Sequence, residues 1–299
     1  MKVLVSGSTG LIGSALVPYL SSQGHSVVRL VRRAGILSED EVRWDPENGV
    51  LEADALHGVE AAVHLAGESI GARRWTASQK QRIRDSRVKG TSLLSEALAG
   101  LDPKPQVLAS ASALGFYGDR GDRLLVEDDS PGGDFLAGVT GEWESATGAA
   151  SNAGIRVVNM RFGLVLDAKA DLIRRTLPVF KAGLGGRLGN GRQYMSWITL
   201  HDLTRAIGHA IVTPGLSGPV NITSPNAVTN REYTRTLGGI LSRPTVFTVP
   251  RLALRLGVGE MADTMLASIR MSPGKLISSG FEFAQPELEA ALREVLGMP

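Results

Sequence analysis

A glycine-rich turn between a mainly apolar stretch and an amphipathic one constrains this chain more than any other feature. Residues 2–6 are mainly apolar, Gly7, Gly10 and Gly13 follow at regular spacing, and residues 11–22 have the apolar period of a helix. Gly7 permits a sharp turn, Gly10 lets an anion approach the main chain, and Gly13 lets the helix pack closely on the strand. The pattern predicts a strand, a phosphate-binding turn and a helix. The alternative is a turn that needs its glycines for steric reasons alone.

The end of the next apolar stretch indicates which nucleotide such a turn would hold. Residues 26–31 read as a second strand, which ends at Val31 and is followed by Arg32 and Arg33. An acidic residue at this point accepts hydrogen bonds from a ribose 2′-hydroxyl, whereas arginine suits a 2′-phosphate. The two arginines therefore favour NADP over NAD. The alternative is that they are ordinary solvated surface residues.

Composition excludes several other classes of protein. The 299 residues are 43% hydrophobic, and 32 basic residues nearly balance 30 acidic ones, so neither nucleic acid nor a membrane is an expected partner. There is no cysteine, and the five histidines lack ligand spacing, so we expect no metal site. We find neither a signal peptide nor an apolar run near the roughly 20 residues of a membrane span, and we expect a cytoplasmic protein.

Strand-like and helix-like segments alternate regularly as far as residue 166, which is typical of a parallel sheet with right-handed crossovers. Further strands are expected at 61–67, at 107–112 and from 156 to 166, and further helices at 78–98 and 135–152. Residues 34–56 read as a polar stretch with a turn at 45–49. Beyond residue 166 this regular pattern changes.

The carboxyl ends of the predicted strands carry candidate ligand contacts. Leu65, Ala66 and Gly67 are small or apolar residues that would permit a cofactor to approach closely, and a plain buried strand with a turn is the alternative. Ser112 ends another strand and Tyr117 follows it. Their hydroxyl groups suit a substrate contact, although a loop-capping serine and a packed tyrosine fit the spacing equally well.

Two basic segments are candidates for contact with phosphate groups. The helix at 78–98 carries four basic residues near its centre, namely Arg82, Arg84, Arg87 and Lys89. One of them would reach a phosphate, or together they form a solvated helix face. Residues 183–192 contain five glycines together with Arg187 and Arg192. This segment is either a mobile loop or a backbone cradle for an anion.

Motifs along essentially the whole chain resemble those of the NAD(P)-dependent epimerase/dehydratase family, among the extended and atypical short-chain dehydrogenases/reductases. The matching residues are 7–13, 65–68, 86–87, 110–112, 117–118, 196–202 and 218–221. The tail is similar to that of an epimerase-like subgroup with a C-terminal domain of unknown function, through residues 259–262, 273–276 and 280–283.

The resemblance implies a Rossmann-type doubly wound parallel α/β sheet with a smaller C-terminal α/β substrate lobe. Residues 1–166 would form most of the dinucleotide-binding domain, to which the chain returns around 196–215. Residues 167–299 would form most of the substrate lobe, with 246–295 as the tail domain of unknown function.

The resemblance also implies an NADP(H) site in which Leu65 and Ala66 contact the adenosine side, Arg87 the phosphates, and Gly163 with Leu164 the nicotinamide. Together with the residue patterns above, it gives these cofactor contacts: Gly7, Thr9, Gly10, Leu11, Ile12, Gly13, Val31, Arg32, Arg33, Leu65, Ala66, Gly67, Arg87, Ser110, Gly163 and Leu164. The substrate that it suggests is a sugar nucleotide, whose diphosphate would bind Arg187 or Arg192.

One departure from the family pattern concerns proton transfer. Typical members carry a tyrosine and, four residues later, a lysine on the helix ahead of a glutamate, and the lysine lowers the pKa of the tyrosine. Counting back from Glu144, these positions fall on Leu136 and Thr140. The usual pair is therefore missing, and Ser112 and Tyr117 are the catalytic candidates at the motif positions. The other titratable candidates, which are usually solvated or structural residues, are Glu142, Glu144, Asp128 and His201.

Two functions fit these observations. The first is an NADP-dependent oxidoreductase or epimerase-like enzyme, which the glycine–arginine segment at 183–192 favours. The second is a non-catalytic NADP(H)-sensing regulatory or binding protein, which the loss of the tyrosine and lysine favours. Relatives often dimerise through helices equivalent to 78–98 and 135–152. Because both helices here mix charged and apolar residues, a monomer and a homodimer both remain open.

Overall fold

The main sheet of the computed structural model, which describes residues 1–33 and 35–298, contains eight strands in the order β13-β8-β6-β5-β1-β2-β3-β4. All neighbours pair in parallel except β3 and β4, which are antiparallel. The strands are β1 (Lys2–Ser6), β2 (Ser26–Val31), β3 (Glu41–Asp45), β4 (Val50–Leu51), β5 (Ala61–His64), β6 (Val107–Ala113), β8 (Arg156–Phe162) and β13 (Gly218–Ile222). This doubly wound sheet confirms the predicted fold class.

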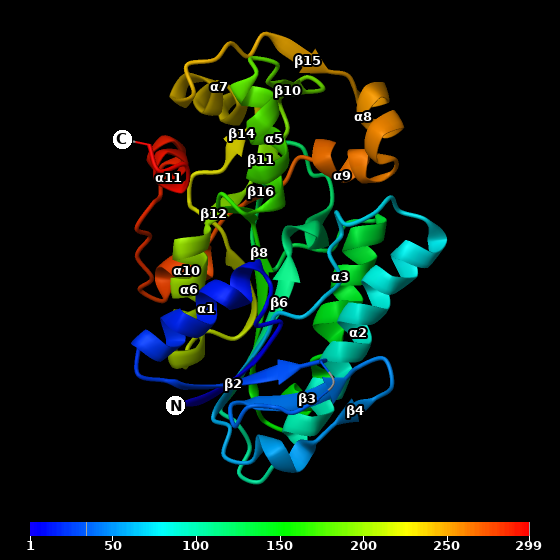
Figure 1. Cartoon of the computed structure of the whole chain (residues 1–299), viewed down its shortest axis with the longest axis vertical. Coiled ribbons are helices and arrows are strands. Elements are labelled where there is room, and N and C mark those ends of the chain that lie inside the picture. Colours follow the sequence, from blue (N-terminus) through cyan, green and yellow to red (C-terminus); the bar gives the residue numbers. More distant parts are fainter. Residues whose placement is uncertain (34, 299) are drawn as a thin grey trace.

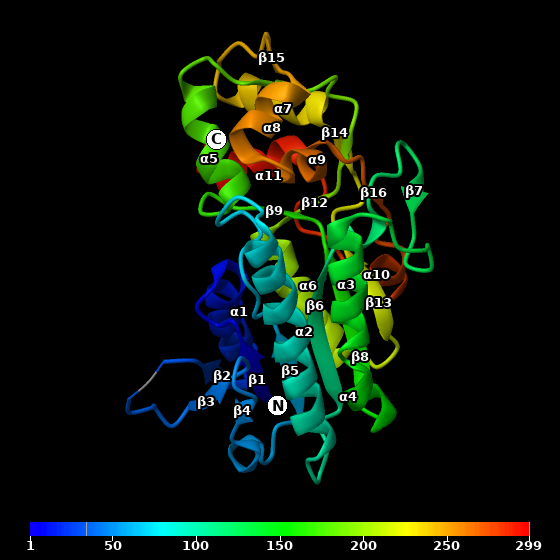
Figure 2. The same cartoon turned by 90° about the vertical axis from the view of Figure 1, so that its right-hand side faces the viewer.

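Helices cover both faces of the main sheet (Figures 1 and 2). One face carries α1 (Leu11–Ser22), α6 (Leu200–Val212) and the short α10 (Gly274–Ser278), and the other carries α2 (Ala77–Ala99), α3 (Phe135–Ser145) and α4 (Gly148–Asn152). The central strands are buried on both faces: Val3 and Val5 pack with the α1 side, whereas Leu4 packs with the α2 side. Continuous apolar runs in the sequence follow from this two-sided burial.

Most of the remaining elements form a smaller lobe over the carboxyl ends of the parallel strands (Figure 1). Its helices are α5 (Asp171–Lys181), α7 (Asn230–Ile240), α8 (Arg251–Val258), α9 (Met261–Leu266) and α11 (Leu288–Val295). Short strands pair here as β9 (Leu164–Leu166) with β12 (Trp197–Thr199), β10 (Gly186–Leu188) with β15 (Phe247–Val249), and β11 (Tyr194–Met195) with β14 (Val228–Thr229). Trp197, Leu237 and Leu292 lie in the core of this lobe.

A third group of short elements connects the lobe with the sheet. The pair β7 (Leu124–Leu125) and β16 (Arg270–Met271) joins the segment after β6 to the C-terminal tail, next to the turn η2 (Leu114–Tyr117). After β12 the chain returns to the main sheet through α6 and β13, and β13 completes its edge beside β8. Residues of the C-terminal half thus belong to both parts of the fold.

Four sequence predictions about local structure were wrong. The polar stretch 34–56 contains β3, β4 and η1 (Ala53–Leu56), although residue 34 lies outside the described part. The helix predicted at 135–152 divides into α3 and α4, and the segment 183–192 contains β10. The single strand predicted from 156 to 166 divides at Gly163, where a Cβ would lie 3.0 Å from the Ser196 carbonyl oxygen. There β9 leaves the main sheet to pair with β12.

Candidate functional site

Close packing at the turn between β1 and α1 leaves no room for a side chain at Gly7 or Gly13. Gly7 has φ +69°, and a Cβ at this residue would lie 2.8 Å from the Leu65 carbonyl carbon. A Cβ at Gly13 would lie 2.2 Å from the Gly7 oxygen, which also accepts a 3.0 Å hydrogen bond from the Gly10 amide. The first turn of α1 contains no acidic residue, and its N-cap, Gly10, has no side chain. The N–H groups at this helix end can therefore bind an anion.

A pocket of about 640 Å³ lies beside this turn, between the ends of β1, β2 and β5 and the helix α2. The predicted cofactor contacts that line it are Gly7, Thr9, Gly10, Val31, Arg32, Arg33, Leu65, Ala66 and Gly67. The other predicted contacts lie outside its lining: Leu11, Ile12, Gly13, Arg87, Ser110, Gly163 and Leu164. The volume is within the range of pockets that hold small molecules and cofactors.

The pocket also has lining residues that sequence reasoning missed, among them Arg29, Glu41 and Trp44. They were missed because the strand β3, which supplies two of them, was not predicted. On α2, Arg82 and Lys89 line the pocket, so part of the basic helix face does reach it.

The arginines at the end of β2 differ in what holds them. The Arg29 guanidinium pairs with Asp40 at 2.9 Å and with Glu41 at 3.2 Å. Arg33 pairs with Glu41 and donates to the Ile36 oxygen at 2.8 Å. Within residues 1–33 and 35–298, Arg32 has neither a hydrogen-bond nor an ion-pair partner, and its side chain is exposed at the pocket. Arg32 is therefore the cation most available to an incoming anion.

Ser6 and His64 hold the pocket-lining backbone of Leu65 and Ala66 in place. Ser6 Oγ accepts hydrogen bonds from the amides of Leu65 at 3.1 Å and Ala66 at 3.3 Å, and it lies 2.6 Å from His64 Nδ1. Burial lowers the pKa of His64 to about 4, so the ring is neutral. Because Ser6 Oγ already accepts from two amides, its own proton is directed to Nδ1. This arrangement holds the Leu65–Ala66 backbone against the glycine turn.

Arg87 lies outside the pocket lining and packs against the loop at Gly67 and Glu68 that lines the pocket. It donates to the carbonyl oxygens of Glu68 and Ile83, both at 3.0 Å, and its guanidinium lies 5.0 Å from the centre of the Trp143 ring. Burial lowers its pKa to about 10. A Cβ on Gly67 would come within 3.5 Å of Arg87 Cζ, so the guanidinium packs directly against the pocket-lining loop. Phosphate contact by Arg87 stays a prediction.

Ser110 lies in a polar row that crosses four parallel strands below the pocket. Pairing places Ser6 beside His64, His64 beside Ser110, and Ser110 beside Asn159. The row therefore runs across the sheet from β1 to β8. His64 Nε2 and Asn159 Oδ1 are buried without hydrogen-bond partners among the described residues, which is typical of positions where an ordered water is held.

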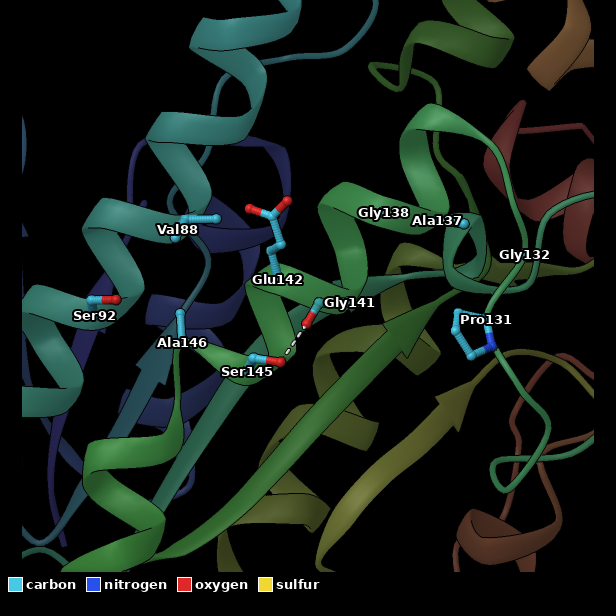
Figure 3. A pocket seen from close by; sticks show the side chains of 10 residues that line it. All are labelled: Val88, Ser92, Pro131, Gly132, Ala137, Gly138, Gly141, Glu142, Ser145 and Ala146. Atoms are coloured by element: carbon cyan, nitrogen blue, oxygen red, sulfur yellow. Dashed lines mark hydrogen bonds between the residues drawn. The ribbon is translucent and has the colours of Figure 1, made fainter.

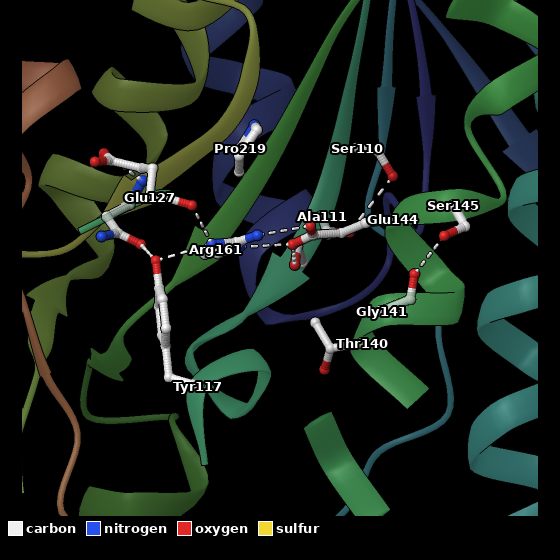
Figure 4. Close-up of polar contacts among 12 residues, drawn as sticks. Ser110, Ala111, Tyr117, Glu127, Thr140, Gly141, Glu144, Ser145, Arg161 and Pro219 are labelled. Carbon is white, nitrogen blue, oxygen red and sulfur yellow. Dashed lines mark hydrogen bonds and ion pairs between the residues drawn. The ribbon is translucent and has the colours of Figure 1, made fainter. Parts of the chain in front are cut away.

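Glu144 and Arg161 form a buried charged network on the α3 side of the sheet (Figure 4), and Ser112 belongs to it. Ser112 Oγ donates to Glu144 Oε1 at 2.5 Å. Arg161, its neighbour on β8, binds both carboxylate oxygens of Glu144 through Nε at 2.8 Å and Nη2 at 2.9 Å. The side chains of Arg161 and Glu144 are only 3% and 12% exposed. The proton of Ser112 is thus directed to Glu144, which leaves its oxygen to act as an acceptor.

Tyr117 is held in the same network and is completely buried. Its hydroxyl donates to Asn221 Oδ1 at 2.7 Å and accepts from Arg161 Nη1 at 3.0 Å (Figure 4). Burial raises the pKa of Tyr117. Among the described residues, Tyr117 is therefore connected to Ser112 through Arg161 and Glu144. The hydroxyl proton of Tyr117 is donated to Asn221, so it is not available to a ligand.

The positions where typical relatives carry tyrosine and lysine are occupied by residues without acid–base chemistry. Thr140 Oγ1 donates to the Leu136 carbonyl oxygen at 2.7 Å, within α3. Leu136 packs on η2, where a Cβ on Gly115 would lie 3.2 Å from Leu136 Cβ. No side chain at either position can donate or accept the proton of a reacting group in the usual way.

Arg187 and Arg192 lie in the smaller lobe and do not line the pocket. Arg187 is on β10 and donates through Nε to Thr248 Oγ1 at 3.0 Å. Arg192 is exposed, and its guanidinium has no partner among residues 1–33 and 35–298. The structure therefore leaves Arg192 freer than Arg187 to bind an anion.

A second pocket, of about 700 Å³, lies between α2 and α3 (Figure 3). Residues such as Val88, Gly138 and Gly141 line it, and Glu142 is the single titratable side chain in its lining. Such a surface has few groups for catalysis. It lies on the two helices for which a homodimer was considered, and the oligomeric state stays open.

Residues 1–33 and 35–298 contain neither a metal-binding cluster nor a membrane-spanning helix. No group of three or more His, Asp or Glu side chains there is arranged to hold a metal ion. No helix in this part combines the length and the apolar character that crossing a membrane requires.

The chain is similar to known proteins over nearly its whole length. Residues 3–222 match the model of the NAD dependent epimerase/dehydratase family, and residues 249–295 match a domain of unknown function, DUF1731. An epimerase family protein of Mycobacterium bovis is 46% identical over 97% of this chain and 96% of its own length.

Two solved structures are similar over 99% of this chain. The human epimerase family protein SDR39U1, crystallised with NADPH, has a TM-score of 0.89 and 29% identity, and the match covers 99% of it. A nucleoside-diphosphate sugar epimerase from Corynebacterium glutamicum has a TM-score of 0.81 and 36% identity, and the match covers 58% of that chain.

Proposed function

Because the chain belongs to the NAD-dependent epimerase/dehydratase family, we propose that it binds NADP(H) beside the Gly7–Gly13 turn and acts as an oxidoreductase or epimerase-like enzyme. The family relationship confirms the resemblance predicted from the motifs. The observation that carries the proposal is the close-packed glycine turn before α1, with Arg32 at the same pocket and its side chain without a partner among the described residues. The similar human protein was crystallised with NADPH, which supports the choice of cofactor.

The residues present fit such a cofactor. The N–H groups at the start of α1 would bind the pyrophosphate, Arg32 the 2′-phosphate, and the Leu65–Ala66 backbone the adenosine side. When bound, the nicotinamide supplies or accepts a hydride. Within this chain, Ser112 would accept a hydrogen bond from a substrate hydroxyl, because its own proton is donated to Glu144.

We propose a sugar nucleotide as the substrate class. The nucleoside-diphosphate sugar epimerase from Corynebacterium glutamicum, at 36% identity, supports this class. The free guanidinium of Arg192 in the smaller lobe is suited to a diphosphate. The division into a dinucleotide-binding part and a substrate lobe is part of the same proposal, and the cytoplasmic location stays a prediction.

A non-catalytic NADP(H) sensor is the second candidate, and a specific observation favours it. Leu136 and Thr140 provide no acid–base group, and the hydroxyl of Tyr117 is fully engaged inside the protein. Under this reading the same pocket binds the nucleotide, but no substrate is converted.

Titration of the purified protein with NADPH and then NADH, followed by incubation with sugar nucleotides and small carbonyl compounds, separates the two candidates. We expect tight binding of NADPH and consumption of the nucleotide with at least one compound. Binding without consumption across the panel would favour the sensor, and binding of neither nucleotide would overturn both.

Arg32→Asp is expected to weaken NADPH binding by about tenfold or more while NADH binding changes by less than about twofold. Arg32 has no side-chain partner in the described part of the chain, and the substitution replaces this cation by an anion that repels a 2′-phosphate. Fluorescence titration with both nucleotides gives the ratio of dissociation constants. An unchanged ratio would show that Arg32 is not the 2′-phosphate contact.

Arg192→Ala is expected to weaken the binding of a diphosphate sugar nucleotide several-fold, by about 1 kcal/mol, without changing NADPH affinity. The side chain is exposed in the lobe and lies outside the lining of the cofactor pocket. Calorimetry with UDP-glucose as the probe, in the presence of NADPH, measures the effect. Equal losses for both ligands would place residues 183–192 in the cofactor site instead.

A further inference from the structure

We propose that Glu41 sets the strength of the preference for a 2′-phosphate, by holding two arginines that would otherwise bind that group. The proposal rests on the NADP(H) site described above and names a specificity-determining residue within it. Glu41 is the first residue of β3 and pairs with Arg29 of β2 in the strand register.

The carboxylate of Glu41 lies in a ring of donors at the edge of the pocket. It receives the guanidinium of Arg33, Nη2 of Arg29 at 3.2 Å and the backbone amide of Ser38 at 3.1 Å. Its side chain is only 5% exposed, although Glu41 lines the pocket. The Ser38 amide and the Arg33 guanidinium hold the pKa of Glu41 below its ordinary value, so the group is an anion at neutral pH.

These donors are of the kind that a phosphate group requires. Guanidinium groups bind carboxylates and phosphates alike through paired N–H donors, and a backbone amide adds a further bond. Glu41 therefore acts as an internal anion that occupies Arg29 and Arg33. An incoming 2′-phosphate meets Arg32 unopposed, but it must compete with Glu41 for Arg33.

Two neighbouring acidic residues show why this competition is specific to Glu41. Glu47 also lines the pocket, but it is exposed and pairs with no arginine in the described part of the chain. Asp40 pairs with Arg29 alone, and its side chain is 49% exposed. Glu41 is thus the carboxylate that binds both arginines.

Glu41→Gln tests the proposal because glutamine keeps the shape of the side chain and an oxygen that can accept from Ser38. We expect the dissociation constant of NADPH to fall by about three- to tenfold, whereas that of NADH changes by less than about twofold. Glu47→Gln removes the same charge from the same pocket, and it is expected to change both constants by less than about twofold. Fluorescence titration with each nucleotide measures these values, and thermal melting checks that each variant is folded.

Whether Glu41→Gln tightens NADPH binding through Arg33 is tested by making the same substitution in a protein that also carries Arg33→Ala. If Glu41 acts by withholding Arg33, the gain from Glu41→Gln shrinks to less than half once Arg33 is absent. An equal gain in that background, or an equal gain from Glu47→Gln, would show a general charge effect and overturn the proposal. So would an unchanged or weaker preference for NADPH in Glu41→Gln itself.

If Glu41→Gln does not fold, Glu41→Asp provides the second test, because the shorter side chain keeps the charge but no longer reaches both arginines. The preference for NADPH is then expected to rise by about twofold, and no rise would overturn the proposal. These outcomes are distinct from failure of the proposed function. Wild-type protein that binds neither nucleotide overturns the cofactor site, whereas wild-type binding with an unchanged preference in the variants overturns the role of Glu41 alone.

Discussion

Replacing Gly13 with alanine is expected to weaken NADPH binding by at least about 100-fold, which corresponds to about 2.8 kcal/mol. The new Cβ would lie 2.2 Å from the Gly7 oxygen and 2.7 Å from Ser8 Cα, distances that force the turn and the start of α1 apart. The amides that face the anion would move with them. Fluorescence titration of the folded variant with NADPH measures the loss.

Two further glycines provide controls for this prediction. Gly138→Ala makes the same substitution in α3, where a Cβ meets nothing within 4 Å, so NADPH binding should be unchanged and stability should rise by up to about 1 kcal/mol. Gly10→Ala should have an intermediate effect, because its Cβ would lie 3.3 Å from the Gly7 oxygen. Wild-type affinity in Gly13→Ala would show that the turn does not hold the nucleotide.

The glycine turn and the strand and helix around it could be predicted because their signals are local. Residues 2–6 and 11–22 were assigned within the limits that the structure shows, and Arg32 was placed at the end of β2. In each case the spacing of apolar residues and glycines within one stretch determines the local structure. The parallel sheet followed from the regular alternation of such stretches.

Elements whose stability comes from distant partners could not be predicted in this way. The strand β10 lies in a glycine-rich segment and forms by pairing with β15, about 60 residues later in the chain. The strand β3 exists as the neighbour of β2, so missing it also hid Glu41 from the candidate site. Polar composition alone indicated a loop in both places.

The charged network around Ser112 was hidden for the same reason. The hydroxyl of Tyr117 meets Asn221, which lies 104 residues away in the sequence, and Arg161 reaches Glu144 only because β8 lies beside β6 and below α3. One signal was available: Arg161 is a charged residue between the apolar Met160 and Phe162 of a predicted strand. A charge in such a place requires a partner, but the sequence does not show which carboxylate provides it.

Glu144→Ala is expected to lower the free energy of unfolding by about 3–5 kcal/mol. The substitution leaves the Arg161 guanidinium, which is 3% exposed, without its carboxylate, and it removes the acceptor of the Ser112 hydroxyl. A buried charge without its partner is much more costly than an exposed one. Urea unfolding followed by circular dichroism measures the change.

Glu142→Ala is the matched control, because it makes the same change two residues earlier on α3. Glu142 pairs with Arg84 at 2.6 Å, but the two side chains are 45% and 42% exposed, so its loss should lower stability by only about 0–1 kcal/mol. Equal losses from both variants would show that burial does not increase the contribution of the Glu144–Arg161 pair to stability.

Combining Glu144→Leu with Arg161→Met should recover part of the stability lost in Glu144→Ala, because no buried charge then lacks a partner. If the double variant is no more stable than Glu144→Ala, the network is maintained by the other bonds of Arg161, to the Tyr117 hydroxyl and the Glu127 carbonyl oxygen.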